Sequence, residues 1–402
     1  MVKYFIIIIY LAFISLGLPD SLLGAAWPVM RLDLDASLEA AGMIAMTITF
    51  GTIVSSLFSE KLIKRFGTGK ITFISVFATA AALLGFSLSN SYIWLIICAI
   101  PLGLGAGSVD AGLNNFVALN YKAHHMSWLH CFWGIGVTMG PVIISRGIKS
   151  NNDWRSGYLT ISIIQFVLVV ILFFSIPVWS KVSKNTNAEN TPGSMPQAEG
   201  PGVRVFKIKG LKLALTAFFF YCGIEATTGL WGSSYLVNIK NMSPADAARW
   251  ISAYYAGITI GRFIVGFITM KLSSKTLIRC GQIIVVIGVI LLLLPLPVQF
   301  SLAGFVLIGL GCAPIFPAML HETPNRFGKN NSQKIMGLQM AIAYVGGALL
   351  PPASGYIAAK TTIRVLPLLL LFFTVSMLAA SELINLTLKK NSTGDPINST
   401  EN

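Results

Sequence analysis

The sequence predicts an all-α membrane protein with twelve transmembrane helices in two pseudo-symmetric six-helix bundles. Apolar residues make up 54% of the 402 residues and charged residues only 11%, with a mean hydropathy of +0.73. A soluble domain of this size would need far more charge to stay dispersed. Apolar stretches of about 20 residues, each long enough to cross a hydrocarbon core as a helix, follow one another along the chain. The two halves of the chain also share residues in the same order.

Short turns separate the predicted helices. The apolar segments lack the alternating polarity of barrel strands, and helices satisfy the backbone within each span. The first segment carries Asp20 and Trp27 and no cleavage site, so it is predicted to be a spanning helix and not a signal peptide. The predicted spans are residues 4–29, 38–60, 69–89, 92–119, 125–148, 156–180, 209–238, 244–271, 274–296, 299–321, 331–359 and 362–388.

The formal charge of +14 follows membrane topology and does not indicate a nucleic-acid partner. With a cytoplasmic amino terminus, the cytoplasmic segments hold more than twice as many Lys and Arg residues as the external ones, in agreement with the positive-inside rule. We therefore expect an integral protein of a bacterial plasma (inner) membrane, in contact with the lipid bilayer, with both termini in the cytoplasm.

The longest polar segment divides the chain into two halves of six spans each. It is rich in Asn, Pro, Gly and Ser, a composition typical of a flexible linker. The predicted domains are an amino-terminal bundle (1–180), a cytoplasmic linker (181–208), a carboxy-terminal bundle (209–390) and a cytoplasmic tail (391–402).

Matching residues recur in both halves in the same order and at a near-constant offset. Asp20 and Gly24, for example, correspond to Glu225 and Gly229. Further matches are Ile48, Thr49, Gly51, Lys61 and Leu62 with Ile258, Thr259, Gly261, Lys271 and Leu272; Gly103, Leu104 and Gly105 with Gly309, Leu310 and Gly311; and Gly136 and Pro141 with Gly346 and Pro351. This pattern predicts a duplicated six-helix unit.

Two six-helix halves joined by a linker resemble the major facilitator superfamily over essentially the whole chain. This resemblance implies a central cavity, alternating access by rocking of the halves, and a monomer. The loop after the second helix matches the family's signature at Arg65, Gly67 and the downstream Lys70. It departs from the signature at Glu60, where the family has glycine, and at Lys64, where the family has an acid.

Four charged side chains are predicted to lie within the membrane: Asp20, Asp110, Glu225 and Arg262. A charge at the centre of a span costs at least about 2.5–3.5 kcal/mol on insertion scales, so such residues are the first candidates for function. Asp20 follows Pro19, where we expect the helix to bend or break. It would bind a proton, a sodium ion or a sugar hydroxyl, unless it is a solvated acid at the outer mouth.

Asp110 and Asn114 are spaced to share one face of the fourth helix. A carboxylate in a low-dielectric cavity is a candidate for proton exchange, and a structural interhelical hydrogen bond is the alternative. His130, on the fifth helix, either relays protons or is a neutral histidine satisfied by the backbone.

Glu225 is followed by Trp231 on the seventh helix. A carboxylate and an aromatic ring together suit a sugar, since the acid accepts hydroxyl protons and the ring covers the apolar face of a pyranose. In the alternative, Trp231 only packs and Glu225 pairs with Arg262. Arg262 is then either a counter-ion in one conformation only or a permanent one, and the sequence leaves both open.

Residues 105–114 are similar to the fourth-helix pattern of the fucose, galactose and glucose proton-symporter branch, where an acid precedes an Asn by four positions. Residues 221–236 and the later Gly261-Arg262-Phe263 resemble that branch's seventh and eighth helices. The resemblance implies proton coupling at Asp20 and Asp110 and sugar contacts at Glu225 and Gln339. The full set of expected substrate-binding residues is Glu225, Asn114, Gln339, Trp231 and His130.

The predicted function is secondary active transport of a small polar solute, a sugar or polyol, coupled to a proton, with sodium as the other candidate ion. Proton-coupled efflux of a hydrophobic or cationic compound and a nontransporting receptor are the alternatives. An enzyme is not expected, because His321-Glu322 lacks the second His of a zinc-protease helix and Pro324 interrupts it. The five cysteines lie on different spans, and the sequence predicts no cofactor, metal or catalytic residue.

Overall fold

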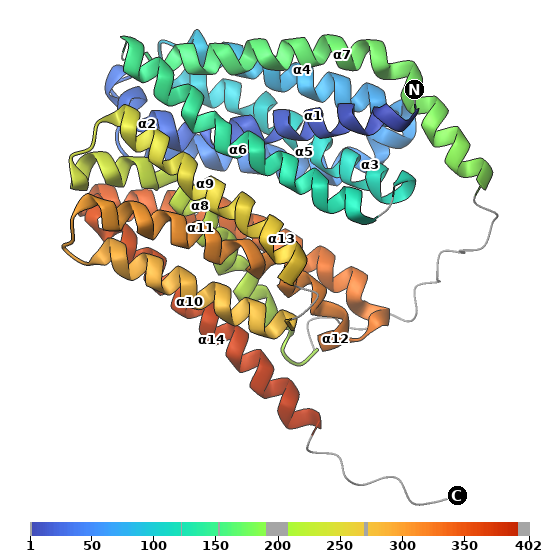
Figure 1. Cartoon of the computed structure of the whole chain (residues 1–402). Coiled ribbons are helices and arrows are strands. Elements are labelled where there is room, and N and C mark those ends of the chain that lie inside the picture. The colour runs from blue at the N-terminus through green and yellow to red at the C-terminus, as the bar shows by residue number, and fades with distance from the viewer. Residues whose placement is uncertain (1, 122, 152, 190–207, 269–271, 393–402) are drawn as a thin grey trace, which may run out of the picture.

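The computed structural model describes the chain except for residues 1, 122, 152, 190–207, 269–271 and 393–402, and all regular structure in the described part is helical. Figure 1 shows two packed bundles. The first contains α1 (Val2–Asp20), α2 (Leu22–Asp33), α3 (Ala40–Phe66), α4 (Thr68–Ser87), α5 (Tyr92–Asn120), α6 (Ala123–Asn151) and α7 (Trp154–Glu189). The second contains α8 (Leu211–Lys240), α9 (Pro244–Ile268), α10 (Ser274–Leu293), α11 (Val298–His321), α12 (Thr323–Phe327), α13 (Lys329–Lys360), the 3₁₀ turn η2 (Ile363–Val365) and α14 (Leu366–Ser392).

Twelve segments of the described chain are long and apolar enough to cross a membrane, which confirms the number expected from the sequence. The first of them, Phe5–Asp33, is broken near its middle: α1 ends at Asp20 and α2 begins at Leu22. Pro19 precedes the break, and a proline disrupts a helix because it lacks a backbone donor and clashes with the preceding turn. Asp20 therefore lies at a helix break deep within a span.

Two helices extend beyond the ends that the sequence predicts. α7 continues to Glu189, so the first residues of the expected linker are helical; this stretch contains neither Pro nor Gly to stop a helix. α3 likewise continues through the signature loop to Phe66, where Gly67 ends it with φ of 84°. That backbone conformation favours glycine.

The repeat seen in the sequence is also present in the packing. Gly136 on α6 lies against the backbone carbonyl of Ile14, and its counterpart Gly346 on α13 lies against the carbonyl of Phe219. Ile14 and Phe219 are themselves separated by the repeat offset. Equivalent close approaches of glycine to backbone join α3 to α5 and α9 to α11. Glycine is needed because any side chain would separate these helices.

The two bundles are packed together at one end of the molecule. We call the end at which α7 finishes and α8 begins the linker end, and the other the far end (Figure 1). Near the far end, Ser145 Oγ on α6 donates to the carbonyl of Ala245 on α9 at 2.8 Å. Deeper in the interface, Ser252 Oγ on α9 donates to the carbonyl of Thr138 on α6 at 2.6 Å. These contacts close the far end.

Candidate functional site

The charged residues predicted to lie within the membrane meet between the bundles. Asp20 lies at the break between α1 and α2, Asp110 on α5, Glu225 on α8 and Arg262 on α9. Asp20 is close enough to both Asp110 and Glu225 for direct electrostatic interaction. Acids that are far apart in the sequence and belong to different halves therefore form one cluster.

Glu225 and Arg262 form an ion pair within the second half. Their Oε1 and Nη2 atoms are 3.6 Å apart, and the side chains are 19% and 20% exposed. Tyr254 lies on α9, one turn before Ile258. Its hydroxyl donates to the backbone carbonyl of Glu225 at 3.0 Å and so holds α8 in place at Glu225. In this conformation the structure therefore shows the pairing that the sequence left as an alternative.

Trp133 on α6 connects this pair to Asp20. Its indole Nε1 donates to Asp20 Oδ2 at 2.9 Å, and the guanidinium of Arg262 lies 5.2 Å from the centre of its ring. Trp133 thus contacts a charged group from each half. The sequence prediction missed this residue, although Trp133 lies three positions after His130 and so faces the same side of its helix.

Asp110 is held by side chains from both halves. Asn114 Nδ2 donates to Asp110 Oδ1 at 2.8 Å and to its backbone carbonyl at 2.9 Å. Tyr344, on α13 of the second half, interacts with the same carboxylate. The predicted shared face of Asp110 and Asn114 is therefore present, and a tyrosine from the opposite half joins it.

His130 is exposed beside the cluster, while two other predicted contacts lie elsewhere. The ring of His130 packs edge-on against Phe13 and interacts electrostatically with Arg262. Trp231 is 1% exposed and donates to the carbonyl of Pro351 at 2.8 Å. Gln339 is also 1% exposed and accepts a hydrogen bond from Thr323 at 2.9 Å. The structure does not bring these last two residues to the cluster, and their contact with substrate stays a prediction.

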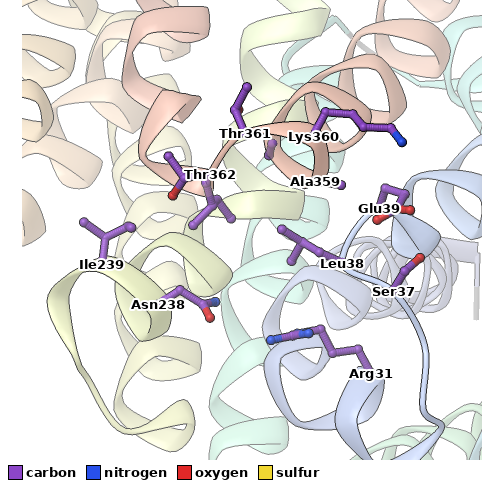
Figure 2. A pocket seen from close by; sticks show the side chains of 12 residues that line it. Arg31, Ser37, Leu38, Glu39, Asn238, Ile239, Ala359, Lys360, Thr361 and Thr362 are labelled. Atoms are coloured by element: carbon purple, nitrogen blue, oxygen red, sulfur yellow. The ribbon is translucent and has the colours of Figure 1, made fainter.

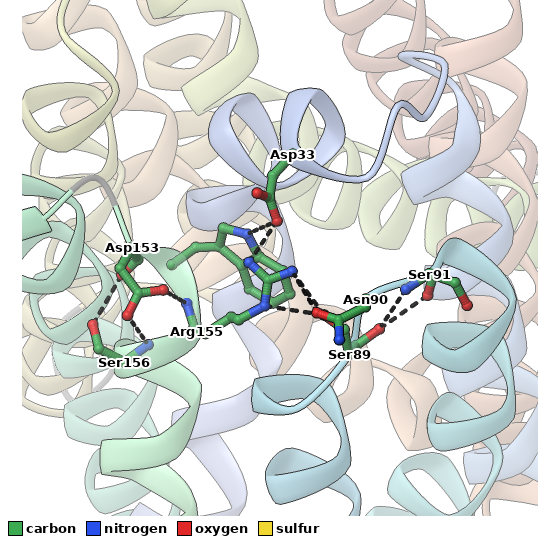
Figure 3. Close-up of polar contacts among 8 residues, drawn as sticks. Asp33, Ser89, Asn90, Ser91, Asp153, Arg155 and Ser156 are labelled. Carbon is green, nitrogen blue, oxygen red and sulfur yellow. Dashed lines mark hydrogen bonds and ion pairs between the residues drawn. The ribbon is translucent and has the colours of Figure 1, made fainter.

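A network near the far end holds the first half together (Figure 3). Arg155 at the start of α7 pairs with Asp33 at the end of α2 at 2.5 Å and donates to the carbonyl of Ser89 at 2.8 Å. Trp154 Nε1 also donates to Asp33 at 3.1 Å, and Arg155 lies 4.4 Å from the Trp154 ring centre. All of these residues belong to one half, so the network ties its helix ends into one unit.

A cavity of about 540 Å³ lies at the far end between the halves (Figure 2). Its polar lining includes Arg31, Glu39, Asn238, Lys360 and Thr362. Along α2, the close contact of Gly24 with Gly229 separates it from Asp20. The cavity therefore belongs to the closed far end and not to the carboxylate cluster.

The cluster has the groups needed to bind protons and hydroxyl-rich solutes. Carboxylates accept protons and hydroxyl donors, and an indole ring can cover an apolar sugar face. Among the described residues, no group of three His, Cys, Asp or Glu side chains could hold a metal ion. The chemistry of the described cluster is thus that of carboxylates, an arginine and aromatic rings.

Comparison with known proteins gives matches over nearly the whole chain. A family model described as Major Facilitator Superfamily matches residues 9–212 and again 213–397. The glucose/mannose transporter GlcP of Bacillus subtilis (strain 168) is 27% identical over 396 residues, which cover 96% of this chain and 95% of that protein.

Two solved structures share the fold. A D-xylose-proton symporter superposes with a TM-score of 0.73 at 11% identity, over 95% of this chain and 97% of that one. A bacterial homolog of the human lysosomal transporter Spinster, in an inward-facing and unoccupied conformation, superposes with a TM-score of 0.73 at 12% identity. That match covers 98% of this chain and 99% of the other.

Proposed function

Since this chain belongs to the Major Facilitator Superfamily, whose members are membrane transporters and not enzymes, we propose that it imports a sugar or polyol together with a proton. The observation that carries this proposal is the cluster of Asp20, Asp110, Glu225 and Arg262 at mid-depth between the halves. A transporter that alternates access holds its substrate and coupling ion at such a midplane interface.

The side chains of the cluster favour a neutral, hydroxyl-rich solute. Asp20 and Glu225 offer carboxylate acceptors from the two halves, and Arg262 offers donors. The similarity to a glucose/mannose transporter and the shared fold with a D-xylose-proton symporter support the same class. Hexoses and pentoses are therefore the first substrates to test.

The coupling ion is assigned to the first half. Ionisable residues inside a membrane span commonly form proton pathways. Of the three acids in the cluster, Asp20 and Asp110 have no arginine partner among the described residues, whereas Glu225 pairs with Arg262. Asp20 is exposed, and because the halves are packed together at the far end, we expect water to reach it from the linker end. The excess of Lys and Arg assigns that end to the cytoplasm, so the proton and sugar would leave there.

Efflux of a cationic compound is less well supported by the geometry. A ligand cation would need the face of an aromatic ring or an unpaired acid. Arg262 already lies against Trp133 and neutralises Glu225. At Trp133 and Glu225 a ligand cation would first have to displace this guanidinium, and at Asp20 or Asp110 it would compete with the proposed proton, which together favour a neutral substrate. All residues of the cluster belong to one chain. The proposed transporter is therefore a monomer, and we place it in a bacterial inner membrane.

Uptake by the purified protein in liposomes tests the proposal. With an inward proton gradient, we expect accumulation of labelled D-glucose, D-mannose or D-xylose and alkalinisation outside. Asp110→Asn should abolish proton-driven accumulation but retain sugar exchange. Asp35→Asn is the matched control, because Asp35 lies outside the spans in a left-handed conformation that Asn also adopts.

Three outcomes would overturn parts of the proposal. Full proton-driven accumulation by Asp110→Asn would remove that residue from coupling. Accumulation that depends on a sodium gradient and not on a proton gradient would change the ion. Uptake of a lipophilic cation, but of no sugar or polyol, would favour the efflux alternative.

A further inference from the structure

We propose that Trp133 transmits the protonation state of Asp20 in one half to the Arg262–Glu225 ion pair in the other. This inference rests on the proton coupling proposed above and assigns Trp133 a positioning role within it. Trp133 contacts both partners directly: 2.9 Å from Nε1 to Asp20 Oδ2, and 5.2 Å from its ring centre to the Arg262 guanidinium. The prediction from sequence did not include this residue.

The hydrogen bond between Trp133 and Asp20 depends on the charge of the acid. An indole N–H is a donor only, and a hydrogen bond to an ionised carboxylate is roughly twice as strong as a neutral one. When Asp20 takes up a proton from water, the bond weakens and the indole is no longer held in one orientation. When the proton returns to water, the bond and the orientation are restored.

The orientation of the indole matters to the second half because Arg262 lies over its ring. A cation over an indole face is attracted by the ring, and more strongly the further it is removed from water. The Arg262 and Glu225 side chains are only 20% and 19% exposed, so a change in ring position alters where the guanidinium is best placed. Loss of the ring contact would therefore loosen the ion pair and the interface between the halves.

Several other groups act on Asp20, and the proposal takes them into account. Asp110 on α5 and Glu225 on α8 interact with it electrostatically, as do Tyr255 on α9 and Tyr344 on α13. Glu225 acts on Asp20 only electrostatically and pairs with Arg262. Among the described residues, Trp133 is the one that both donates a hydrogen bond to Asp20 and touches Arg262. The neighbouring carboxylates influence the pH at which Asp20 binds a proton, whereas Trp133 transmits that change to the Arg262–Glu225 pair of the other half.

The molecule contains a second group of a Trp, an Asp and an Arg with similar contacts, but these contacts do not join the two halves. Near the far end, Trp154 donates to Asp33 and Arg155 lies over the Trp154 ring. There, however, Arg155 pairs directly with Asp33, and all three residues are in the first half. Trp154 therefore serves as the matched control for the substitution of Trp133.

The test compares Trp133→Phe with Trp154→Phe in liposomes. Both changes keep an aromatic ring and remove the N–H donor. Phe keeps an aromatic face for the sugar, so we expect Trp133→Phe to retain sugar exchange, but to lose proton-driven accumulation about tenfold relative to exchange and to flatten the pH profile of exchange. Trp154→Phe should keep the wild-type coupling ratio and lower only the Tm.

A double-mutant cycle shows whether Trp133 acts through Asp20. Asp20→Asn imitates the protonated acid, so adding Trp133→Phe to it should cause no further loss, whereas independent residues would give additive losses. An unchanged ratio of accumulation to exchange in Trp133→Phe, additive losses, or a raised KM with intact coupling would each overturn the proposal. If wild type itself shows no proton-driven uptake, the proposed function has failed instead.

Discussion

The backbone of Gly24 on α2 packs directly against that of Gly229 on α8. These glycines occupy equivalent positions of the two repeats, so the same point of each half meets its counterpart across the interface. A side chain on Gly24 would collide with the carbonyl oxygen of Gly229. The close approach lies between Asp20 and the far end, and it helps to seal the carboxylate cluster from that side.

Gly24→Ala should shift the protein towards a state that is open at the far end, because the packed interface has no room for a methyl group. The measurement is the rate at which an impermeant maleimide labels Ser233→Cys, a fully buried position one turn beyond Gly229 on α8, in a Cys280→Ser background. We expect labelling to become several-fold faster. The control is Gly337→Ala, where an added Cβ meets open space; equal rates in both variants would contradict this role of Gly24.

Ser145→Ala and Ser252→Ala should weaken the closed far end in the same direction. Each hydroxyl donates to a carbonyl of the opposite half, at 2.8 and 2.6 Å, and a typical hydrogen bond contributes about 1 kcal/mol. Each change should therefore shift the closed-to-open ratio by about fivefold. In the double variant the two free-energy changes should add, so the two fold-changes multiply. Labelling of the same cysteine reports the ratio.

The control for the two serines is Thr387→Ala, whose hydroxyl donates at 2.7 Å to Leu383 of its own helix. That bond does not cross the interface, so its loss should leave the labelling rate unchanged. If Thr387→Ala accelerated labelling as much as the serine variants, the effect would reflect general destabilisation.

Glu225→Gln should destabilise the protein by roughly 1–3 kcal/mol, because it leaves Arg262 without its counter-ion. This is below the range for fully buried pairs, since the two side chains keep 19% and 20% exposure. Removing both charges in Glu225→Gln with Arg262→Gln should recover most of the Tm. Thermal unfolding in detergent measures this, with Glu60→Gln at the exposed Lys64 pair as a control that should change little.

The opposite result would also be informative. If the double variant were as unstable as Glu225→Gln, loss of the Arg262 contact with Trp133 would cost as much stability as removal of the unpaired charge recovers. An unchanged Tm in the single variant would show that solvent already screens the pair.

The two tryptophans show how far a site can be predicted in this kind of chain. Trp231 and Trp133 both lie in glycine-rich apolar helices near an ionisable residue, and the sequence favours Trp231 because the carboxylate of Glu225 is on the same helix. In the structure Trp231 bonds to Pro351 in the interior of its half, whereas Trp133 meets Asp20 and Arg262. Membrane helices are apolar towards lipid and towards their neighbours alike, so periodicity does not identify the face that points to the cluster.

Residue order and composition alone establish the twelve helices, the duplication, the break beside Pro19 and the few charges that enter the membrane. These follow from local free-energy costs. The backbone of a span must be hydrogen-bonded within a helix, a proline disrupts that helix, and a charge within the bilayer is costly and therefore rare unless it is functional. Only the tertiary packing decides that Glu225 pairs with Arg262 within the second half, that Tyr344 reaches Asp110 and that Trp133 joins Asp20 to the other half. Two of these contacts join residues more than a hundred positions apart. The third depends on how two helices are rotated about their axes, which all of their neighbours determine, so no local pattern encodes these contacts.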